Sequence, residues 1–324
     1  MIKVGIIGAA GYTAGELIRI LINHPDIELT YLYSNSQAER DITSVHDDLL
    51  GQTDLKFSAE IKETDVVFLC QGHGKSREFL DHHTFNAQTK IIDLSQDFRH
   101  QTKAQWDDRT FVYGLPELNK SKITSAKNIA NPGCFATAIQ LAILPLAQAG
   151  LLKDEVHVNA ITGSTGAGQA PGATTHFSWR NNNVSIYKAF EHQHLVEITE
   201  SVKSLQPAFD QDINFIPVRG NFSRGILASV YTTFEGSASD ALKLYQEFYA
   251  DAAFTTVTDQ GIHLKQVINT NNALVSVEKH KNKILITSII DNLLKGASGQ
   301  AVENMNLMFG LDQSTGLKLK ANLF

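Results

Sequence analysis

The residues most suited to chemistry are a cysteine at the start of an apolar stretch and a pair of histidines. Cys134 follows Asn131-Pro132-Gly133 and opens a strongly apolar run up to Gln148, which predicts a thiol in the first turn of a helix. Unpaired N–H groups and the helix dipole favour a thiolate there, and the same groups are suited to holding an oxyanion. The Pro-Gly pair removes one donor and lets a ligand approach the backbone. Cys134 is therefore the predicted nucleophile.

The second cysteine, Cys70, fits the alternative interpretation of a lone cysteine as a small buried hydrophobe, because it ends the apolar run Val66–Cys70. Two cysteines far apart in the sequence do not form a disulfide framework. The first residues resemble a buried strand rather than a signal peptide, and no apolar run approaches the length of a membrane helix. We therefore expect a cytoplasmic protein with reduced thiols.

A thiolate nucleophile needs an acid/base partner, and His192 and His194 are the strongest candidates among 12 histidines. On a helix, residues two apart point about 200° away from each other, so one of the two is expected to be catalytic and the other supportive. The pattern does not decide which. His73 and His176 are more typical of loop or packing residues. A zinc site is disfavoured because no Cys/His/carboxylate set at metal spacing accompanies the pair, and no metal is expected.

A glycine-rich turn follows the first apolar run, Lys3–Ile7, and opens an amphipathic stretch. At such a strand-to-helix turn, backbone N–H groups and the helix dipole are suited to a dinucleotide pyrophosphate, although the Gly-x-x-Gly-x-x-Ala spacing differs from G-x-G-x-x-G. Such turns also occur for packing reasons alone, but the βαβ context favours the cofactor. The residues expected to bind it are Gly8, Ala10, Gly11, Tyr12, Thr13 and Ala14.

The end of the second apolar run, Ile27–Tyr33, bears on the choice of cofactor. An NAD site normally has an acidic residue here to bind the ribose 2′-hydroxyl, but this sequence has Ser34 and Ser36, with Arg40 a few residues on. Hydroxyls and a guanidinium suit a 2′-phosphate, so NADP is the predicted cofactor. The alternative is a turn in which the serines only satisfy local backbone groups.

The alternation of apolar runs and amphipathic stretches up to about residue 130 predicts an α/β protein that begins with a Rossmann-type parallel sheet. Beyond Glu155 the pattern changes to period-2 strands, which predicts an α+β catalytic domain with a mixed sheet. We place the NADP-binding domain at 1–150 and the catalytic and oligomerisation domain at 151–297. A helical segment, about 298–324, is expected to pack back onto the first domain. The Gly/Ser/Thr-rich loop Thr162–Asn183 is expected to carry function or to be disordered.

Composition excludes several classes of protein. The 324 residues are 43% hydrophobic and 19% charged, which is ordinary for a globular protein of one or two domains. A net charge of −6 is unlike the basic surface that neutralises nucleic-acid phosphates. Neither a nucleic-acid nor a membrane partner is expected, and a small-molecule substrate is.

Taken together, these motifs resemble N-acetyl-γ-glutamyl-phosphate reductase, the third enzyme of arginine biosynthesis in the aspartate-semialdehyde-dehydrogenase-like superfamily. The resemblance covers essentially the whole chain, and its specificity comes from the order and spacing of the motifs. They are Gly8–Thr13, Asp93–Arg99, Tyr113–Glu117, Asn131–Cys134, Gly163–Gly168, His192–His194, Arg224–Ile226 and Asp291–Gln300.

The resemblance implies that Cys134 attacks the acyl phosphate of N-acetylglutamyl 5-phosphate and expels phosphate. The resulting thioester is reduced by NADPH to N-acetylglutamate 5-semialdehyde. His192 or His194 would take the thiol proton and later return one to the departing aldehyde oxygen. A dinucleotide turn, a thiol at a helix start and a nearby imidazole are also the minimal equipment for this chemistry on the residues alone. The family also implies a homo-oligomer, a dimer or a tetramer.

The anionic substrate requires cations and hydroxyls, and the cofactor requires further contacts. Arg99 is the first choice for the substrate because it follows the apolar run Ile91–Leu94, near the carboxyl end of a strand. Ser95 and Lys188 are the other expected substrate residues, and Arg180 and Arg224 are weaker candidates. Loop residues expected to contact the cofactor are Ser164, Gly166 and Gly168, and the family motif adds Asn292.

Three departures from the family pattern affect loop geometry more than chemistry. They are Ala14 where glycine is frequent, Val196 where proline is expected, and Cys70-Gln71-Gly72-His73 in place of a Pro-His-Gly approach. Two alternatives stay open: a related reductase acting on aspartyl or aminoadipyl phosphate, since one methylene is worth only about 1–3 kcal/mol of discrimination, and a non-catalytic NADP sensor. The sensor predicts a dispensable thiol.

Overall fold

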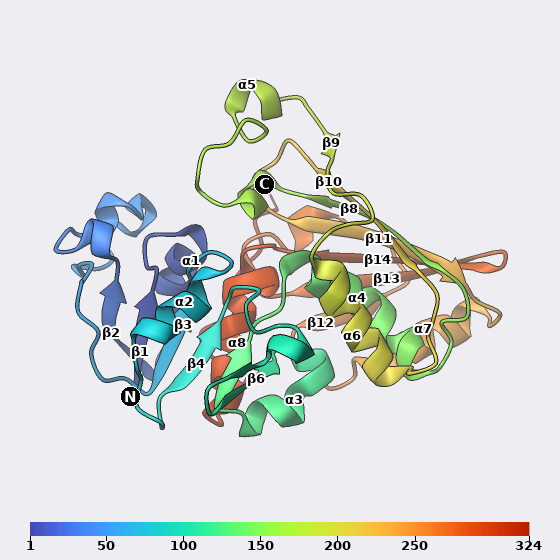
Figure 1. The fold of residues 1–324 in the computed structure, drawn as a ribbon. Coiled ribbons are helices and arrows are strands. Elements are labelled where there is room, and N and C mark those ends of the chain that lie inside the picture. The colour runs from blue at the N-terminus through green and yellow to red at the C-terminus, as the bar shows by residue number, and fades with distance from the viewer. Residues whose placement is uncertain (324) are drawn as a thin grey trace. The chain divides into compact units, whose positions relative to one another are not determined.

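The computed structural model describes residues 1–323 as two compact units (Figure 1). The first unit contains Met1–Pro132 and Ala297–Lys318, and the second contains Gly133–Gly296 and the described residues from 319 onward. The division therefore lies between Pro132 and Gly133 rather than at residue 150, because the helix that begins at Cys134 packs in the core of the second unit. The returning segment ends at Lys318, short of the expected 324.

The first unit is built on a seven-stranded sheet in the order β2-β1-β3-β4-β7-β6-β5. All neighbouring strands run parallel except β5 and β6. The central strands are apolar throughout because helices cover both faces of such a sheet. The predicted Rossmann-type parallel sheet is confirmed. Its strands are β1 (Ile2–Ile7), β2 (Ile27–Tyr33), β3 (Val66–Leu69), β4 (Lys90–Asp93), β5 (Gln105–Trp106), β6 (Arg109–Tyr113) and β7 (Asn128–Ala130).

Four α-helices belong to the first unit: α1 (Tyr12–Leu21), α2 (Lys75–His82), α3 (Pro116–Ser125) and α8 (Gly299–Met308). Every residue of α8 is buried. The Ser298 hydroxyl donates a 2.7 Å hydrogen bond to the Thr13 carbonyl, and the Asn304 amide donates to the Gly114 carbonyl at 2.8 Å. The returning helix is thus an integral part of this unit.

The second unit is built on a mixed seven-stranded sheet in the order β12-β13-β14-β11-β8-β10-β9. The pairs β8–β10 and β12–β13 are parallel and the others are antiparallel, as predicted for the catalytic domain. The strands are β8 (Val156–Thr162), β9 (Ser185–Ile186), β10 (Ile213–Arg219), β11 (Ile226–Thr233), β12 (Thr255–Thr258), β13 (Ala273–His280) and β14 (Lys283–Ile290).

One face of this mixed sheet packs against helices α4 (Cys134–Gln148), α6 (His194–Leu205) and α7 (Ala238–Phe248) (Figure 1). Strands β8 and β11 alternate between buried and more exposed residues, since every second side chain faces the helices. Helix α4 is apolar almost all round and lies in the middle of this core. Its N-terminus is therefore held rigidly.

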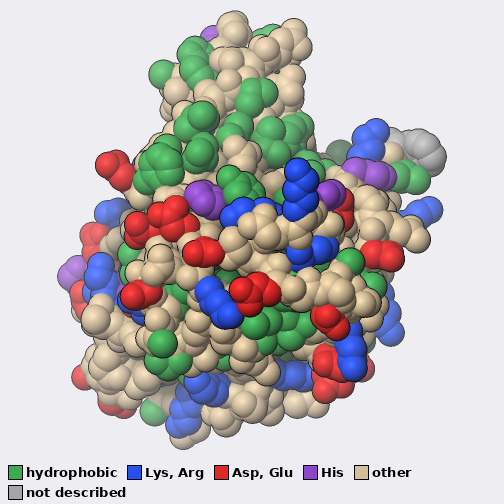
Figure 2. Space-filling view, turned by 90° about the vertical axis from the view of Figure 1, so that its right-hand side faces the viewer, with side chains coloured by type: hydrophobic (Ala, Val, Ile, Leu, Met, Phe, Trp, Pro, Cys, Tyr) green, Lys and Arg blue, Asp and Glu red, His purple; other side chains and the backbone are tan. Residues whose placement is uncertain are grey.

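The loop Thr162–Asn183 contains a single helical turn at Ser164–Ala167 and the short helix α5 (Phe177–Arg180). Large apolar side chains are exposed on and just after it, and Figure 2 shows hydrophobic side chains gathered on this protruding part of the unit. They are Phe177, Trp179, Val184, Ile186 and Phe190. Separately, no helix within residues 1–323 combines the length and the hydropathy that crossing a bilayer would require.

Candidate active site

The thiol of Cys134 lies at the N-terminus of a rigid buried helix. Cys134 is the first residue of α4, Gly133 is its N-cap, and the cysteine is half-buried. A Cβ placed on Gly296 would lie 2.8 Å from the Cβ of Cys134, so only a glycine lets that backbone pass so close to the cysteine. The chain therefore leaves the thiol beside the open N–H groups of the first turn of α4.

The imidazole of His194 packs directly on the residue before the cysteine. A Cβ on Gly133 would lie 2.4 Å from His194 Nε2, which is well inside van der Waals contact. His194 begins α6 and is buried, with only 6% of its surface exposed. Position 133 therefore requires glycine because the imidazole leaves no room for a side chain. This reason adds to the one given by the sequence, that a glycine lets a ligand approach the backbone.

Glu197 lies beside both Gly133 and His194, and it is not among the residues predicted from the sequence. Its Oε2 accepts a 3.1 Å hydrogen bond from the Gly133 N–H, and its Oε1 lies 3.9 Å from His194 Nε2. The carboxylate is 2% exposed, so it acts in a low-dielectric environment and favours positive charge on the imidazole. The spacing of Glu197 three residues after His194, on one helix face, is the signal that could have found it.

His192 occupies a different environment from His194, although their ring centroids are only 4.6 Å apart. Burial, with smaller contributions from Lys188 and Arg219, lowers the pKa of His192 to about 4. Its Nδ1 accepts a hydrogen bond from the His194 backbone N–H at 3.3 Å. His192 therefore stays neutral near pH 7. Its Nδ1, the ring nitrogen that carries the free lone pair, already accepts this hydrogen bond.

The glycine-rich turn of the first unit has the geometry expected of a strand-to-helix junction. Gly8 has φ +77°, and a Cβ there would lie 3.1 Å from the Cys70 carbonyl group, so both conformation and space require glycine. The N–H groups of Gly8 and Ala9 donate to the Tyr33 carbonyl at 3.1 and 3.0 Å, which ties the turn to β2. Gly11 is the N-cap of α1.

The other predicted turn residues follow from this geometry. Ala10 and Thr13 are half-buried, Tyr12 is exposed, and Ala14 is buried inside the first turn of α1. N–H groups in the first turn of a helix have no partner within the helix, and they form a cradle suited to a pyrophosphate. The turn thus fits a dinucleotide.

His46 supports this turn from a distant part of the sequence. Its Nε2–H donates a 2.8 Å hydrogen bond to the Ala9 carbonyl. A Cβ on Gly15 would lie 2.7 Å from His46 Nδ1, so α1 carries a glycine where the imidazole packs. His46 is buried and orients the peptide between Ala9 and Ala10. It was missed because nothing near it in the sequence signals this contact.

The residues predicted for the 2′-phosphate lie just after β2. Ser34 is buried, and Ser36 and Arg40 are exposed around the short helical turn Asn35–Gln37. The Arg40 guanidinium donates a 2.7 Å hydrogen bond to the Gln37 side chain. The structure therefore leaves a solvent-accessible guanidinium at the carboxyl end of β2.

The two substrate candidates of the first unit have internal partners. Ser95 is buried, and its hydroxyl donates a 2.8 Å hydrogen bond to Asp93. Arg99 is also buried, and it donates from Nε to the Asn131 carbonyl at 2.8 Å and from Nη2 to the Leu94 carbonyl at 2.9 Å. Arg99 therefore fixes the peptide that leads to Pro132 and Gly133, a structural task that its sequence position did not predict.

Candidates in the second unit differ in the same way. Gly166 and Gly168 are exposed, Ser164 is half-buried, and Gly168 has φ +84°. Asn292 is buried, where its Oδ1 accepts from the Gly225 N–H at 2.7 Å and its Nδ2 donates to Thr165 Oγ1 at 3.0 Å. The amide thus holds the base of the loop in place. The glycines leave the loop backbone open to a ligand.

The cationic candidates of the second unit, Lys188, Arg224 and Arg180, are also distinguished by their partners. Lys188 is exposed and its Nζ donates to the Gln193 side chain at 3.2 Å. Arg224 forms an ion pair with the fully buried Asp291 at 3.0 Å. Arg180 is buried and donates to the carbonyls of Asn183 and Arg219. Lys188 is therefore the most accessible of the three.

Cys70 has none of the features of a nucleophile. Burial raises the pKa of its thiol far above the ordinary value, and the nearby charge of Asp93 acts in the same direction. Thr13 is a hydrogen-bond partner of the thiol. Cys70 is thus the natural control for Cys134.

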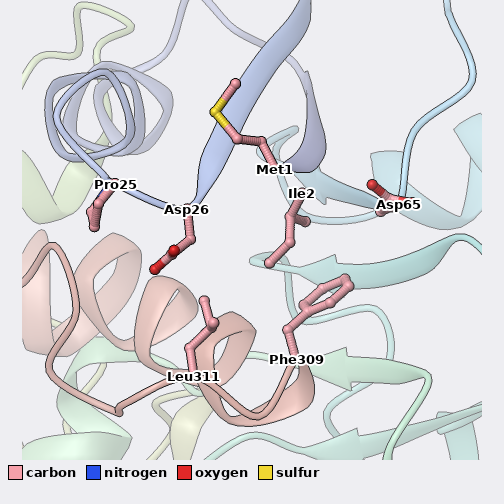
Figure 3. Close-up of a pocket in the computed structure, with 7 residues that line it drawn as sticks. All are labelled: Met1, Ile2, Pro25, Asp26, Asp65, Phe309 and Leu311. Carbon is pink, nitrogen blue, oxygen red and sulfur yellow. The ribbon is translucent and has the colours of Figure 1, made fainter.

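A hollow of the first unit lies at the amino ends of its strands (Figure 3). It is lined by Met1, Ile2, Pro25, Asp26, Asp65, Phe309 and Leu311. Ile2, Asp26 and Asp65 mark the amino ends of β1, β2 and β3. Parallel sheets bind their ligands at the carboxyl ends of the strands, so this hollow is the wrong edge for a cofactor. In the described part of the chain, no group of three or more His, Cys, Asp or Glu side chains is arranged for a metal ion.

Comparison with known proteins gives two family-model matches and close full-length relatives. Residues 3–126 match the semialdehyde dehydrogenase NAD binding domain, and residues 134–292 match the semialdehyde dehydrogenase dimerisation domain. Proteins called N-acetyl-gamma-glutamyl-phosphate reductase are 61% identical in Christiangramia forsetii and 56% identical in Flavobacterium johnsoniae, with 100% of both chains covered in each case.

Solved structures share the fold at low sequence identity. Aspartate semialdehyde dehydrogenase II from Vibrio cholerae superimposes with a TM-score of 0.70 at 15% identity, covering 96% of this chain and 98% of that one. Aspartate semialdehyde dehydrogenase with NADP from Candida albicans gives a TM-score of 0.70 at 13% identity, with 95% and 98% covered. The two-unit architecture is therefore that of semialdehyde dehydrogenases.

Proposed function

The chain belongs to the N-acetyl-gamma-glutamyl-phosphate reductase family, and from this premise we propose that Cys134 carries the acyl group as a thioester with His194 as its acid/base partner. The protein is a nicotinamide-dependent reductase of an acyl phosphate, which releases phosphate and forms N-acetylglutamate 5-semialdehyde. The packing of His194 and Glu197 on Gly133, one residue before the thiol, is the observation that carries the residue assignment.

The thiol chemistry follows from these neighbours. His194 takes the proton from the Cys134 Sγ, and the sulfur attacks the acyl carbon. A C–S bond forms and the C–O bond to phosphate breaks, so the electron pair leaves with phosphate. Glu197 stabilises the positive charge on His194, and the open N–H groups of α4 stabilise the oxyanion. The nicotinamide cofactor, when bound, supplies the hydride that reduces the acyl group.

His194 is favoured over His192 as the acid/base group by hydrogen bonding. The Nδ1 of His192 already accepts from a backbone N–H, and its pKa of about 4 makes it a weak base at neutral pH. His194 has a carboxylate beside its Nε2. His192 therefore acts as a support that positions the start of α6.

The reverse reaction tests the covalent step. NADPH formation is followed from N-acetylglutamate 5-semialdehyde, phosphate and NADP in the wild type, in Cys134→Ala and in Cys70→Ala. We expect phosphate-dependent turnover that falls at least about 10⁴-fold in Cys134→Ala only. Turnover that survives in Cys134→Ala would overturn the thioester. A wild type that binds NADP but turns over only aspartate or aminoadipate semialdehyde would instead overturn the substrate.

NADP is the proposed cofactor within the nicotinamide class. The support is the exposed Arg40 with Ser34 and Ser36 at the carboxyl end of β2, together with the Candida albicans aspartate semialdehyde dehydrogenase, whose solved structure contains NADP. Gly8, Gly11 and the first turn of α1 would hold the pyrophosphate. The ratio of kcat/KM for NADPH over NADH is expected to exceed about 10 and to fall about tenfold in Arg40→Met. An initial preference for NADH would overturn this assignment.

The second unit is proposed to assemble with a second copy of the chain, as a dimer or tetramer. The support is its match to a dimerisation domain and the exposed apolar side chains of Phe177, Val184, Ile186 and Phe190. A surface of this kind is unusual on a monomer. Light scattering of the wild type and of Ile186→Lys tests it, because the charge is expected to weaken the oligomer. A monomeric wild type at micromolar concentration contradicts the proposal.

A further inference from the structure

A guanidinium group that the sequence analysis did not single out lies over an aromatic ring next to His192. Arg219 is the last residue of β10, and its guanidinium carbon is 4.5 Å from the ring centroid of Tyr187. The Tyr187 ring centroid is in turn 5.9 Å from that of His192. The charge of Cys134 acts on Tyr187, and the charge of Arg219 acts on both Tyr187 and His192. These four side chains of the second unit therefore form one cluster.

Arg219 has no carboxylate to neutralise it. Within residues 1–323, no Asp or Glu oxygen lies within 4.0 Å of its guanidinium, and its buried Nε has no hydrogen-bond partner. Its guanidinium is a hydrogen-bond partner of the Tyr187 side chain, and burial holds that phenol neutral by raising its pKa to about 12. A cation that is half-buried without a counter-ion carries an electrostatic cost that a bound anion would offset.

The backbone around Arg219 is firmly held. Buried Arg180 donates a 2.7 Å hydrogen bond to the Arg219 carbonyl, and it also donates to the Asn183 carbonyl and the Ser185 hydroxyl. Arg219 pairs with Ser185 across β9 and β10. Arg180 and Arg219 also repel each other, since Arg219 contributes, after burial, to lowering the pKa of Arg180. The Arg219 backbone is therefore fixed, and within residues 1–323 neither of these two neighbouring guanidinium groups has a carboxylate partner.

We propose that Arg219 binds an oxyanion of the substrate beside Cys134, and this inference rests on the proposed function. The substrate class brings two oxyanions to the site, the acyl phosphate and a carboxylate. A guanidinium can meet either of them with two parallel hydrogen bonds. Arg219 is thereby a substrate-binding residue, whereas Arg180 acts only by positioning it.

Steady-state kinetics in the reverse direction test this role and identify the oxyanion. KM for phosphate and KM for N-acetylglutamate 5-semialdehyde are measured for the wild type, Arg219→Met, Arg219→Lys and the control Lys243→Met. Lys243 lies exposed on α7, and its replacement removes the same charge away from the site. We expect Arg219→Met to raise one KM about 10- to 100-fold, with Arg219→Lys in between and Lys243→Met unchanged. A rise for phosphate assigns the phosphoryl group, and a rise for the semialdehyde assigns the carboxylate.

Other outcomes separate this inference from the proposed function. Both KM values unchanged in Arg219→Met, in a variant whose melting temperature matches the wild type, would overturn the role of Arg219 while the wild type remains active. A shifted pH profile of kcat with unchanged KM would mean that Arg219 acts only through His192, and would also overturn it. If Arg219→Met does not fold, Arg219→Lys decides by the same KM test. A wild type without phosphate-dependent turnover would instead contradict the proposed function.

Discussion

Each unit of this protein contains a helix start against which a histidine packs so closely that the chain requires a glycine. In the first unit, His46 packs on Gly15 of α1, and in the second, His194 packs on Gly133 at the N-cap of α4. The partners of the two imidazoles differ. His46 donates to the Ala9 carbonyl, whereas His194 lies beside the carboxylate of Glu197 and one residue from a thiol.

Under the proposed function, this difference separates a positioning histidine from a reactive one. A hydrogen bond to a backbone carbonyl needs a protonated ring nitrogen at all times, so His46 gains nothing by releasing its proton. A buried carboxylate stabilises an imidazole that has just accepted a proton, so His194 is prepared to change its charge. The same packing device thus fixes a peptide in one unit and prepares proton transfer in the other.

Replacing the glycine under His194 is expected to have the largest effect. In Gly133→Ala the new methyl group would lie 2.4 Å from Nε2, so the imidazole or α4 must move by about an ångström. A displacement of this size lowers kcat of the reverse reaction by about 100-fold. KM for the cofactor stays near the wild-type value because Gly133 is not among the residues expected to contact the cofactor.

Two matched glycine replacements sharpen this result. Gly261→Ala meets open space within 4 Å and should leave kcat unchanged. Gly15→Ala displaces His46 instead, and we expect a higher KM for NADP with kcat nearly retained. Equal losses of kcat in Gly133→Ala and Gly15→Ala would mean that the two histidines do not differ as argued.

Glu197→Gln tests the carboxylate while keeping the side-chain volume. The amide oxygen still accepts the hydrogen bond from Gly133, but the negative charge beside His194 is gone. We expect kcat to fall about tenfold or more and the alkylation of Cys134 by iodoacetamide at pH 7 to slow. A variant that loses kcat with unchanged alkylation would show that Glu197 acts only on packing.

The sequence predicts those parts of the site that are local. Cys134 and His192-Gln193-His194 are visible because the reactive side chains adjoin their own helix starts, and Gly8 to Thr13 follow a strand directly. His46 and Arg219 are not visible, because His46 meets Ala9 across 37 residues and Arg219 meets Tyr187 across two strands. Arg99 shows a related limit, because its place near a strand end does not reveal that its guanidinium also donates to the Asn131 carbonyl.

Prediction of the fold from the sequence is likewise limited to local patterns. Apolar runs such as Lys3–Ile7 identify buried parallel strands, but the two-residue strands β5 and β9 have no such pattern. The segment Cys134–Gln148 is apolar on all sides, so its sequence does not show which unit it joins. Only the contacts of α4 with the mixed sheet place it in the second unit.

His46→Ala is expected to have a smaller effect, confined to cofactor binding. Loss of the 2.8 Å bond to the Ala9 carbonyl frees the peptide before Ala10, so we expect KM for NADP to rise about tenfold with kcat unchanged. His46→Gln keeps a donor and should recover part of the loss. A general destabilisation would reduce the active fraction without changing KM, which distinguishes the two causes. An unchanged KM in His46→Ala contradicts the positioning role.

The smallest expected effects are opposite pH dependences of stability in the two units. Burial raises the pKa of Asp93 in the first unit from 3.8 to about 6, so the folded state holds a proton that the unfolded state has released. Between pH 7 and pH 5 this stabilises the fold by about 1 kcal/mol, and Asp93→Asn should lack that gain. In the second unit, burial lowers the pKa of His192 from 6.5 to about 4, so the unfolded state takes up the proton first and the same acidification destabilises.

Urea midpoints of the wild type, Asp93→Asn and His192→Gln at pH 7 and pH 5 measure these two contributions. Relative to the wild type, Asp93→Asn should lose stability on acidification and His192→Gln should gain it, because each variant removes one of two opposing slopes. The Asn side chain keeps an acceptor for the Ser95 N–H but not for the Ser95 hydroxyl, so each variant is compared with itself at the two pH values and that loss cancels. If both variants shift in the same direction, the two buried groups do not titrate in the opposite senses that their surroundings require.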